Sequence, residues 1–183
     1  MVKKPELTDS FILIRPYTKA DIERLFEAAH ESVAEISPWM EWCHPGYSIV
    51  ESREWVGKQD GAWEKGTDYN FTIVDPRDGR YLGGCGLNGL NHGNKLANLG
   101  YWVRTSRTKQ GVASAATRLL AGFGFKELGL RRIEIVVAVE NKASQRVADK
   151  AGATREGVLR NRLFYYDKPH DVVMFSLIPS DIL

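Results

Sequence analysis

The stretch that decides the fold of this chain is Tyr101-Trp-Val-Arg-Thr-Ser-Arg-Thr-Lys-Gln-Gly-Val-Ala-Ser-Ala-Ala116. It begins with aromatic and β-branched residues, which favour a strand, and ends in alanines, which favour a helix. The polar loop between them carries Arg104, Arg107 and Lys109, and Gly111 stands at the turn into the helix. Such a junction directs free backbone N–H groups and the positive end of the helix dipole at one point. The stretch therefore predicts a phosphate or pyrophosphate site, although an ordinary connection with solvated basic residues explains it equally well.

Length and composition predict a single globular domain over residues 1–183, with 43% hydrophobic and 26% charged residues. The net charge of +2 gives no general attraction to nucleic acid or to an anionic membrane, so we expect neither as a partner. No apolar run is long enough for a membrane span or reads as a signal-peptide core. With only Cys43 and Cys85, a disulfide framework is not expected, and the cytoplasm is the predicted location.

Hydrophobic periodicity predicts three elements in the first third of the chain. They are a strand at Phe11–Arg15 that Pro16 ends, a helix from an N-cap at Thr18 to Glu35, and a helix from Ser48 to Trp63. Ser48 and Glu51 have the spacing of a capping box at the start of the second helix.

The loop between these helices is Ser37-Pro-Trp-Met-Glu-Trp-Cys-His-Pro-Gly46. Its two tryptophans, acid and histidine could lie over a substrate cleft. Trp39 and Trp42 could equally form a hydrophobic clasp between the helices, and Glu41 and His44 could simply be solvated. The sequence leaves these readings open.

From residue 69 onward the pattern alternates strands and helices. The predicted strands are Tyr69–Val74, Arg80–Leu87, Leu96–Val103, Ile133–Val139, Gly157–Tyr166 and Asp171–Ile178, with a turn at Asp75–Gly79 and a loop at Asn88–Asn94. The predicted helices run from Gly111 to Gly129 and from Asn141 to Lys150, where Gly152 is the C-terminal stop. The apolar run Ile133–Val139 is typical of a strand buried on both faces, parallel to and beside Leu96–Val103. The order β-α-α-β-β-β-α-β-α-β-β predicts a mixed α/β fold.

Eight segments in this order carry a resemblance to a known family. They are Leu13-Ile-Arg-Pro16, Pro38-Trp-Met-Glu-Trp42, Gly83-Gly84, Leu99-Gly-Tyr-Trp-Val103, Gly111-Val-Ala-Ser-Ala-Ala116, Phe125-Lys-Glu-Leu-Gly-Leu-Arg-Arg-Ile133, Glu140-Asn-Lys-Ala-Ser144 and Glu156-Gly-Val-Leu-Arg160. Over nearly the whole chain the sequence resembles the GNAT superfamily of N-acetyltransferases, especially ribosomal-protein N-terminal acetyltransferases of the RimJ/RimL type.

The resemblance implies acetyl-CoA as the cofactor. The family holds the pyrophosphate with the amides of a loop patterned Gln/Arg-x-x-Gly-x-Gly/Ala, which here is Thr108-Lys-Gln-Gly-Val-Ala113. Gly111 and Ala113 match, whereas Thr108 replaces the usual Gln or Arg. Lys109 stands where glycine is common, which makes any positive φ there costlier.

The resemblance further implies that the central strands splay apart around pantetheine. The implied cofactor contacts are Trp102, Val103, Thr108, Lys109, Gln110, Gly111, Val112, Ala113, Ser114, Asn141 and Ser144. Asn141 would hydrogen-bond the pantetheine arm, and Ser144 would protonate the leaving thiolate. Many relatives use a tyrosine to supply that proton, but Ala148 occupies its place here. The alternative interpretation of Ser144 is an ordinary surface serine in the first turn of a helix.

The catalytic base is the weak link of this resemblance. Asn98 and Leu163 stand where relatives carry acids, so Glu41 and Glu156 are the remaining candidates, or merely structural residues. An α-amine of pKa near ~8 is roughly a tenth neutral at pH 7, whereas a lysine near ~10.4 is neutral at about one part in 2,500. A weak base therefore predicts an α-amino or weakly basic acceptor.

Two other functions fit the same residues. The acceptor could be a small-molecule amine instead of a protein N-terminus, or the chain could be a non-catalytic regulator that binds acetyl-CoA. Hydrolase elbows, Gly-Lys-Ser/Thr phosphate loops and histidine pairs at metal spacing are absent from the sequence, so no metal is expected. A monomer and a homodimer are both compatible with the sequence.

Overall fold

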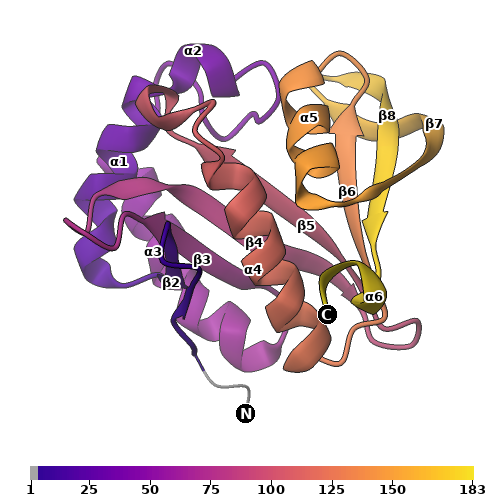
Figure 1. Cartoon of the computed structure of the whole chain (residues 1–183). Coiled ribbons are helices and arrows are strands. Elements are labelled where there is room, and N and C mark those ends of the chain that lie inside the picture. The colour runs from indigo at the N-terminus through magenta and orange to yellow at the C-terminus, as the bar shows by residue number, and fades with distance from the viewer. Residues whose placement is uncertain (1–3) are drawn as a thin grey trace.

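The computed structural model describes residues 4–183. Its eight strands form one sheet in the order β1-β2-β3-β4-β5-β6-β8-β7 (Figure 1). The strands are β1 (Leu7–Thr8), β2 (Leu13–Pro16), β3 (Tyr69–Val74), β4 (Tyr81–Asn91), β5 (Leu96–Val103), β6 (Arg132–Ala138), β7 (Thr154–Tyr165) and β8 (Lys168–Leu177). Only β5 and β6 pair in parallel, as the helix between them predicts.

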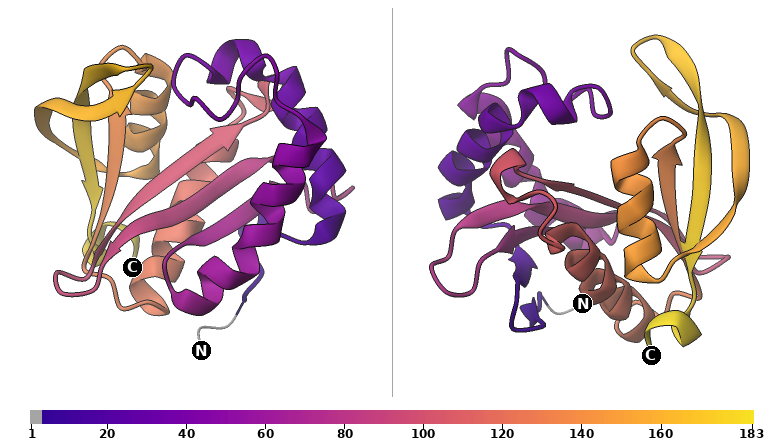
Figure 2. Two further views of the ribbon diagram at one scale, coloured as in Figure 1. Left: turned by 180° about the vertical axis from the view of Figure 1, so that it is seen from behind. Right: turned by 45° about the horizontal axis from the view of Figure 1, so that its top comes forward.

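Helices cover both faces of this sheet (Figures 1 and 2). On one side lie α1 (Ile22–Glu31), α2 (Val33–Ile36) and α3 (Ile49–Lys65), and on the other α4 (Val112–Lys126), α5 (Lys142–Ala151) and α6 (Pro179–Ile182). Short 3-10 turns η1 (Lys19–Asp21) and η2 (Thr105–Arg107) precede α1 and α4. The fold is the predicted mixed α/β arrangement with additional short elements at its ends.

The main core lies between the sheet and α4. Leu87, Leu99 and Leu120 are fully buried there, and Ala115 and Ala116 let the helix approach the strands closely. A second cluster, formed by Tyr17, Leu25, Ala28, Val56 and Tyr81, holds α1 and α3 on the opposite face. The two helical layers are thus fixed independently against one sheet.

The sheet opens between β5 and β6. These strands pair only at Leu96↔Arg132, Ala97↔Ile133 and Asn98↔Glu134, whereas β6 stays paired with β8 as far as Ala138↔Val172. Figure 2 shows the β6-β8-β7 arm diverging from the rest of the sheet, with α5 beside it. The predicted splay of the central strands is therefore confirmed.

Two predicted elements were wrong in their boundaries. The helix expected to run to Glu35 breaks at Ser32, whose hydroxyl donates to the Ala28 carbonyl at 2.6 Å, so that α1 and α2 are separate. The loop expected at Asn88–Asn94 is mostly strand, because β4 continues to Asn91 through an irregular pairing with β5. Gly89, at φ +58°, absorbs that irregularity inside the strand instead of forming a turn.

The first strand and β6 also depart from expectation. The first predicted strand is shifted to Leu13–Pro16, with Pro16 paired to Phe71 and Phe11 exposed. β6 is fully buried on one face only, because Glu134 and Val136 lie on a half-buried face. Within residues 4–183, none of the helices has the length and apolar character needed to cross a bilayer.

Candidate active site

The loop before α4 forms a cradle of main-chain amides. Gly111 caps the helix at φ +86°, and Lys109 also adopts a positive φ of +62°. In the described part of the chain, the backbone N–H groups of residues 109–114 have no acceptor. Together with the helix dipole, these amides could hold an anion such as a pyrophosphate.

This loop is held from the opposite side by the end of α1. Glu31 accepts hydrogen bonds from Arg104 Nε at 3.0 Å and from the Ser106 amide at 2.8 Å, and Ser32 Oγ accepts one from the Thr105 amide at 3.0 Å. The Arg104 guanidinium holds the pKa of Glu31 down at about 2. Arg104 is therefore a tether, and the basic side chains left to face an anion are Arg107 and Lys109.

The gap between β5 and β6 exposes main-chain groups of β5. The Arg104 amide donates to the Leu82 carbonyl at 2.9 Å, and hydrogen-bonded positions alternate along an antiparallel ladder. Tyr101 and Val103 therefore direct their main-chain groups away from β4 and into the gap. Trp102 faces β4 with its main chain, which leaves only its side chain free to contact a ligand.

Ser144 lies where the gap meets α5. Asn141 caps this helix, its Oδ1 accepting from the Ser144 amide at 3.0 Å, and its Nδ2 is left to donate to a ligand. Tyr101 Oη donates to the Ser144 carbonyl at 3.0 Å and lies 3.0 Å from Ser144 Oγ. Since the phenol has one proton, the Ser144 hydroxyl donates to the tyrosine oxygen.

Tyr101 stays a neutral phenol at ordinary pH, because burial raises its pKa to about 12. Its ring comes from β5 and its partner from α5, so the pair spans the open gap. Ala148 lies one turn beyond Ser144 on α5, is buried and offers no proton. Ser144 Oγ and Tyr101 Oη are thus the two hydroxyls that the structure brings together at this point.

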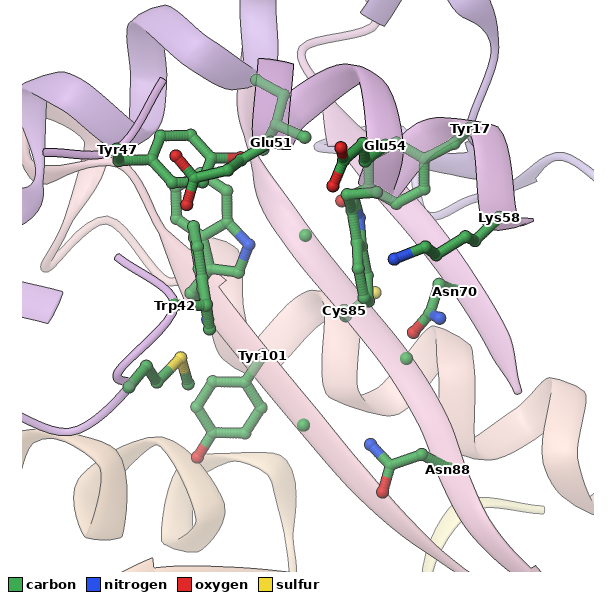
Figure 3. A pocket seen from close by; sticks show the side chains of 17 residues that line it. Tyr17, Trp42, Tyr47, Glu51, Glu54, Lys58, Asn70, Cys85, Asn88 and Tyr101 are labelled. Carbon is green, nitrogen blue, oxygen red and sulfur yellow. The ribbon is translucent and has the colours of Figure 1, made fainter. Parts of the chain in front are cut away.

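A cavity of about 380 Å³ lies on the other face, between α3, the loop before it and strands β3 to β5 (Figure 3). Its walls are aromatic: Tyr17, Trp42, Tyr47, Trp55, Tyr101 and Trp102. Trp42 packs edge-on against Trp102, with ring centroids 5.3 Å apart, and against Tyr47 at 5.6 Å. Trp42, from the loop at residues 37–46, thus lines this cavity and also packs against its aromatic neighbours.

The polar groups of the cavity come mainly from α3. Glu51 accepts from the Ser48 hydroxyl at 2.9 Å and amide at 2.8 Å, which lowers its pKa, and lies 2.9 Å from His44 Nε2. The predicted capping box is therefore confirmed. Glu54 and Lys58 line the cavity with no hydrogen bond or ion pair to any residue between 4 and 183.

Comparison with known proteins identifies the family of this arrangement. A family model for the acetyltransferase (GNAT) domain matches residues 12–154. The ribosomal-protein-serine acetyltransferase of Escherichia coli (strain K12) is 31% identical over 157 residues, which cover 86% of this chain and 87% of that protein. The chain belongs to the GNAT acetyltransferase family.

Solved structures agree with this GNAT fold. A Vibrio cholerae protein described as a ribosomal-protein-serine acetyltransferase superposes with a TM-score of 0.85 at 29% identity, over 98% of this chain and 100% of that one. RimJ of Mycobacterium smegmatis, solved in complex with a CoA-disulfide, gives a TM-score of 0.86 at 23% identity, over 97% of this chain and 88% of that one. GNAT enzymes use acetyl-CoA, and the amides of residues 109–114 beside an open gap fit that molecule.

The structure does not bring every predicted residue of this acetyltransferase to the site. The Thr108 amide is used by the Thr105 carbonyl at 3.2 Å, so Thr108 lies outside the free cradle. The Trp102 indole faces the cavity on the α3 side instead of the gap. Gln110, Val112, Ala113 and Ser114 all lie in the cradle or the first turn of α4.

Glu41 and Glu156, the two remaining candidate bases, both bind other parts of the chain. Glu41 accepts from the Tyr166 amide at 2.7 Å and so ties the loop before α3 to the β7–β8 hairpin. Glu156 binds Arg132 at 2.6 Å, which lowers the pKa of the acid, and also accepts from Ser176. Neither carboxylate lines the cavity.

The cavity residues of α3 and the sheet were missed from sequence. One signal was available: Glu51, Glu54, Trp55 and Lys58 recur at helical spacing, yet they form a polar and aromatic face instead of an apolar one. A second signal was the set of glycines in strand interiors, which marks close approach of a ligand or another backbone. Neither signal shows that α3 and strands β3 to β5 come together to form a cavity.

Proposed function

We propose that this acetyltransferase transfers the acetyl group of acetyl-CoA to the N-terminal α-amine of a protein. One observation carries the proposal. Among the described residues, no histidine lines the cavity, and its unpaired carboxylate, Glu54, lies across the cavity from Tyr101 (Figure 3). The end of the cavity nearest Ser144 therefore lacks a side chain that could deprotonate a strongly basic amine.

The acidity of the acceptor then decides which amine reacts. At pH 7 the neutral fraction of an α-amine exceeds that of a lysine side chain by roughly two hundredfold, given pKa values near ~8 and ~10.4. Water can accept the proton at little cost from an amine that is already roughly a tenth neutral. The name of the Escherichia coli relative, a ribosomal-protein-serine acetyltransferase, supports a protein N-terminus as the acceptor.

The residues take complementary roles in this proposal. Acetyl-CoA, when bound, supplies an activated acetyl thioester. The amides of residues 109–114 hold its pyrophosphate, with Lys109 adding charge, and the main chain of Tyr101 and Val103 with Asn141 Nδ2 lines the pantetheine path. Ser144 Oγ is the proton donor, and Tyr101 keeps that hydroxyl oriented at the end of the gap.

The test is a competition between two amines. A peptide with a free N-terminus and no lysine, and a matched N-terminally blocked peptide with one lysine, are each incubated with acetyl-CoA at pH 7. Thiol release and the mass of the peptide are followed. We expect kcat/KM to favour the α-amine by at least about a hundredfold, as the neutral fractions require. Equal rates, or a preference for lysine, would refute the proposal.

A small-molecule amine is the second candidate acceptor, because the aromatic cavity of about 380 Å³ is large enough to enclose one. The same assay with a panel of small amines shows whether a small amine or a peptide N-terminus is the better acceptor. As to location, we propose the cytoplasm, which suits the free, buried Cys43 and Cys85.

A further inference from the structure

The orientation of Asn70 in the cavity is fixed by its neighbours. Gln59 Nε2 donates to the Trp55 carbonyl at 2.7 Å, and a carbonyl can only accept. The Gln59 oxygen therefore faces Asn70 and accepts from Asn70 Nδ2 at 2.9 Å. Asn70 Oδ1 is left as a hydrogen-bond acceptor in the cavity wall.

Asn88 presents the opposite kind of group. Its Oδ1 accepts from Asn98 Nδ2 at 3.0 Å, which leaves Asn88 Nδ2 as a donor. Asn88 also lines the cavity, two residues beyond Gly86 on β4. Figure 3 shows Asn70 and Asn88 along one side of the cavity, with Tyr101 on the opposite side.

The sheet between these groups carries almost no side chains. The register places Asn70 opposite Gly86, and Gly86 opposite Gly100. A Cβ on Gly86 would come within 1.9 Å of Asn70 Oδ1, so that oxygen lies directly over the glycine.

Gly100 is different, because the fold does not require it. A Cβ there would meet no atom within 4 Å, and Gly100 does not adopt a positive φ. A glycine in a strand interior marks a bulge, a bend or the close approach of a backbone or ligand. Gly100 pairs regularly with Gly86 and no atom of the described chain lies near its Cβ position, which leaves the approach of a ligand. The bare surface over Gly100 is open to the cavity.

We propose that the first peptide group of the acceptor lies on this glycine floor. Its N–H donates to Asn70 Oδ1, and its C=O accepts from Asn88 Nδ2. A peptide group carries one donor and one acceptor, which matches the two groups that the cavity leaves unpaired. The inference rests on the proposed function and adds a rule: the enzyme selects an amine that is followed by a peptide bond.

This rule separates acceptor classes by chemistry. In a protein N-terminus the first peptide group begins one carbon from the α-amine, so the amine can face Tyr101 while the peptide group contacts the asparagines. A lysine side chain has four methylenes in that place, and a simple alkylamine has no peptide group.

The decisive experiment changes the acceptor. The tripeptide Ser-Ala-Ala amide is compared with the same peptide methylated on its first peptide nitrogen. In the unaltered enzyme we expect methylation to lower kcat/KM about tenfold, the usual loss for one hydrogen bond with a buried partner left unpaired. In the Asn70→Leu variant the two peptides should react alike. Asn94→Leu, on the exposed β4–β5 turn, is the matched control and should keep the tenfold difference.

Two further variants test the other contacts. Asn88→Leu should lower kcat/KM for the tripeptide about tenfold, whereas the control Asn94→Leu should not. Gly100→Ala should lower kcat/KM for the tripeptide at least as strongly, with no loss of thermal stability, because a Cβ at this position meets no atom within 4 Å.

The outcomes distinguish this inference from the proposed function. If α-amines are acetylated but methylation has no effect in the unaltered enzyme, or the same effect in Asn70→Leu, the inference is wrong and the proposed function stands. If only lysine side chains are acetylated, both are wrong. A methylation effect that disappears in Asn70→Leu and persists in Asn94→Leu supports the inference.

Discussion

The proposed cofactor site, called the groove below, and the proposed acceptor cavity meet at Tyr101, but they are built from different parts of the chain. The groove is formed by main-chain amides of residues 109–114 and by the main chain of β5, all within one short stretch. The cavity is formed by side chains of α3, β3, β4 and β5, which come together only in the folded chain. A main-chain site can be recognised from one local pattern, whereas a side-chain site requires the tertiary arrangement. Each variant below affects one region and should spare the other.

The largest expected effect is that of Ser144→Ala at the junction of the two regions. Without the proton donor, kcat should fall about a hundredfold, which is the low end of the range for general acid catalysis. The dissociation constant for acetyl-CoA, measured by calorimetry, should not change. Ser180→Ala on α6 is the control. A kcat within twofold of the unaltered enzyme would show that the proton comes from elsewhere.

Gly111→Val should weaken acetyl-CoA binding by at least about tenfold. A β-branched residue at φ +86° is strained by about 1–2 kcal/mol, and relieving the strain turns the cradle amides away. Gly129→Val is a matched control, because Gly129 has φ +65° and open space around it but follows the other end of α4. Both variants should lose stability, and only Gly111→Val should lose affinity. Equal affinities in the two variants would place the pyrophosphate elsewhere.

Glu31→Gln should have a smaller effect, about threefold on acetyl-CoA affinity, because it loosens the loop without removing the cradle. The pKa of Glu31 is lowered to about 2 in the folded protein, so its tether is complete above about pH 4.5 and is lost as the pH falls towards 2. Acidification through this range should therefore weaken binding more in the unaltered enzyme than in Glu31→Gln. Glu27→Gln, an exposed position on α1, should behave like the unaltered enzyme.

The smallest effect is expected for Lys109→Gly. Glycine removes about 1 kcal/mol of strain at φ +62°, but it adds a comparable entropy to the unfolded chain. The free energy of unfolding, measured in urea, should therefore change by less than about 1 kcal/mol. Loss of the charge should reduce the salt dependence of acetyl-CoA binding. An unchanged salt dependence would show that Lys109 does not face the anion.

The local geometry of the groove could be predicted from the sequence because its signals are local. Gly111 before the alanines indicated the turn into α4, and the helix predicted from Asn141 placed Ser144 in the first turn of α5. Arg104 misled the prediction, since its partner Glu31 lies 73 residues earlier and no local pattern links them.

The cavity could not be predicted because its parts are distant in sequence. Asn88 was assigned to a loop, since Asn-Gly-Leu-Asn has the composition of a turn, yet pairing with β5 keeps it in a strand. Glu51 was recognised as a cap, but its place in the cavity wall depends on how α3 packs on the sheet. The same is true of Gly100, whose open surroundings are visible only once the strands are paired.

The most direct test is calorimetric binding of a conjugate that joins CoA, through an acetyl linker, to the α-amine of Ser-Ala-Ala amide. If groove and cavity form one continuous site, the conjugate should bind at least about a hundredfold more tightly than CoA, because the second contact becomes intramolecular. Asn70→Leu should remove part of that gain, and Gly111→Val should weaken CoA and conjugate alike. A conjugate that binds no more tightly than CoA would contradict the account.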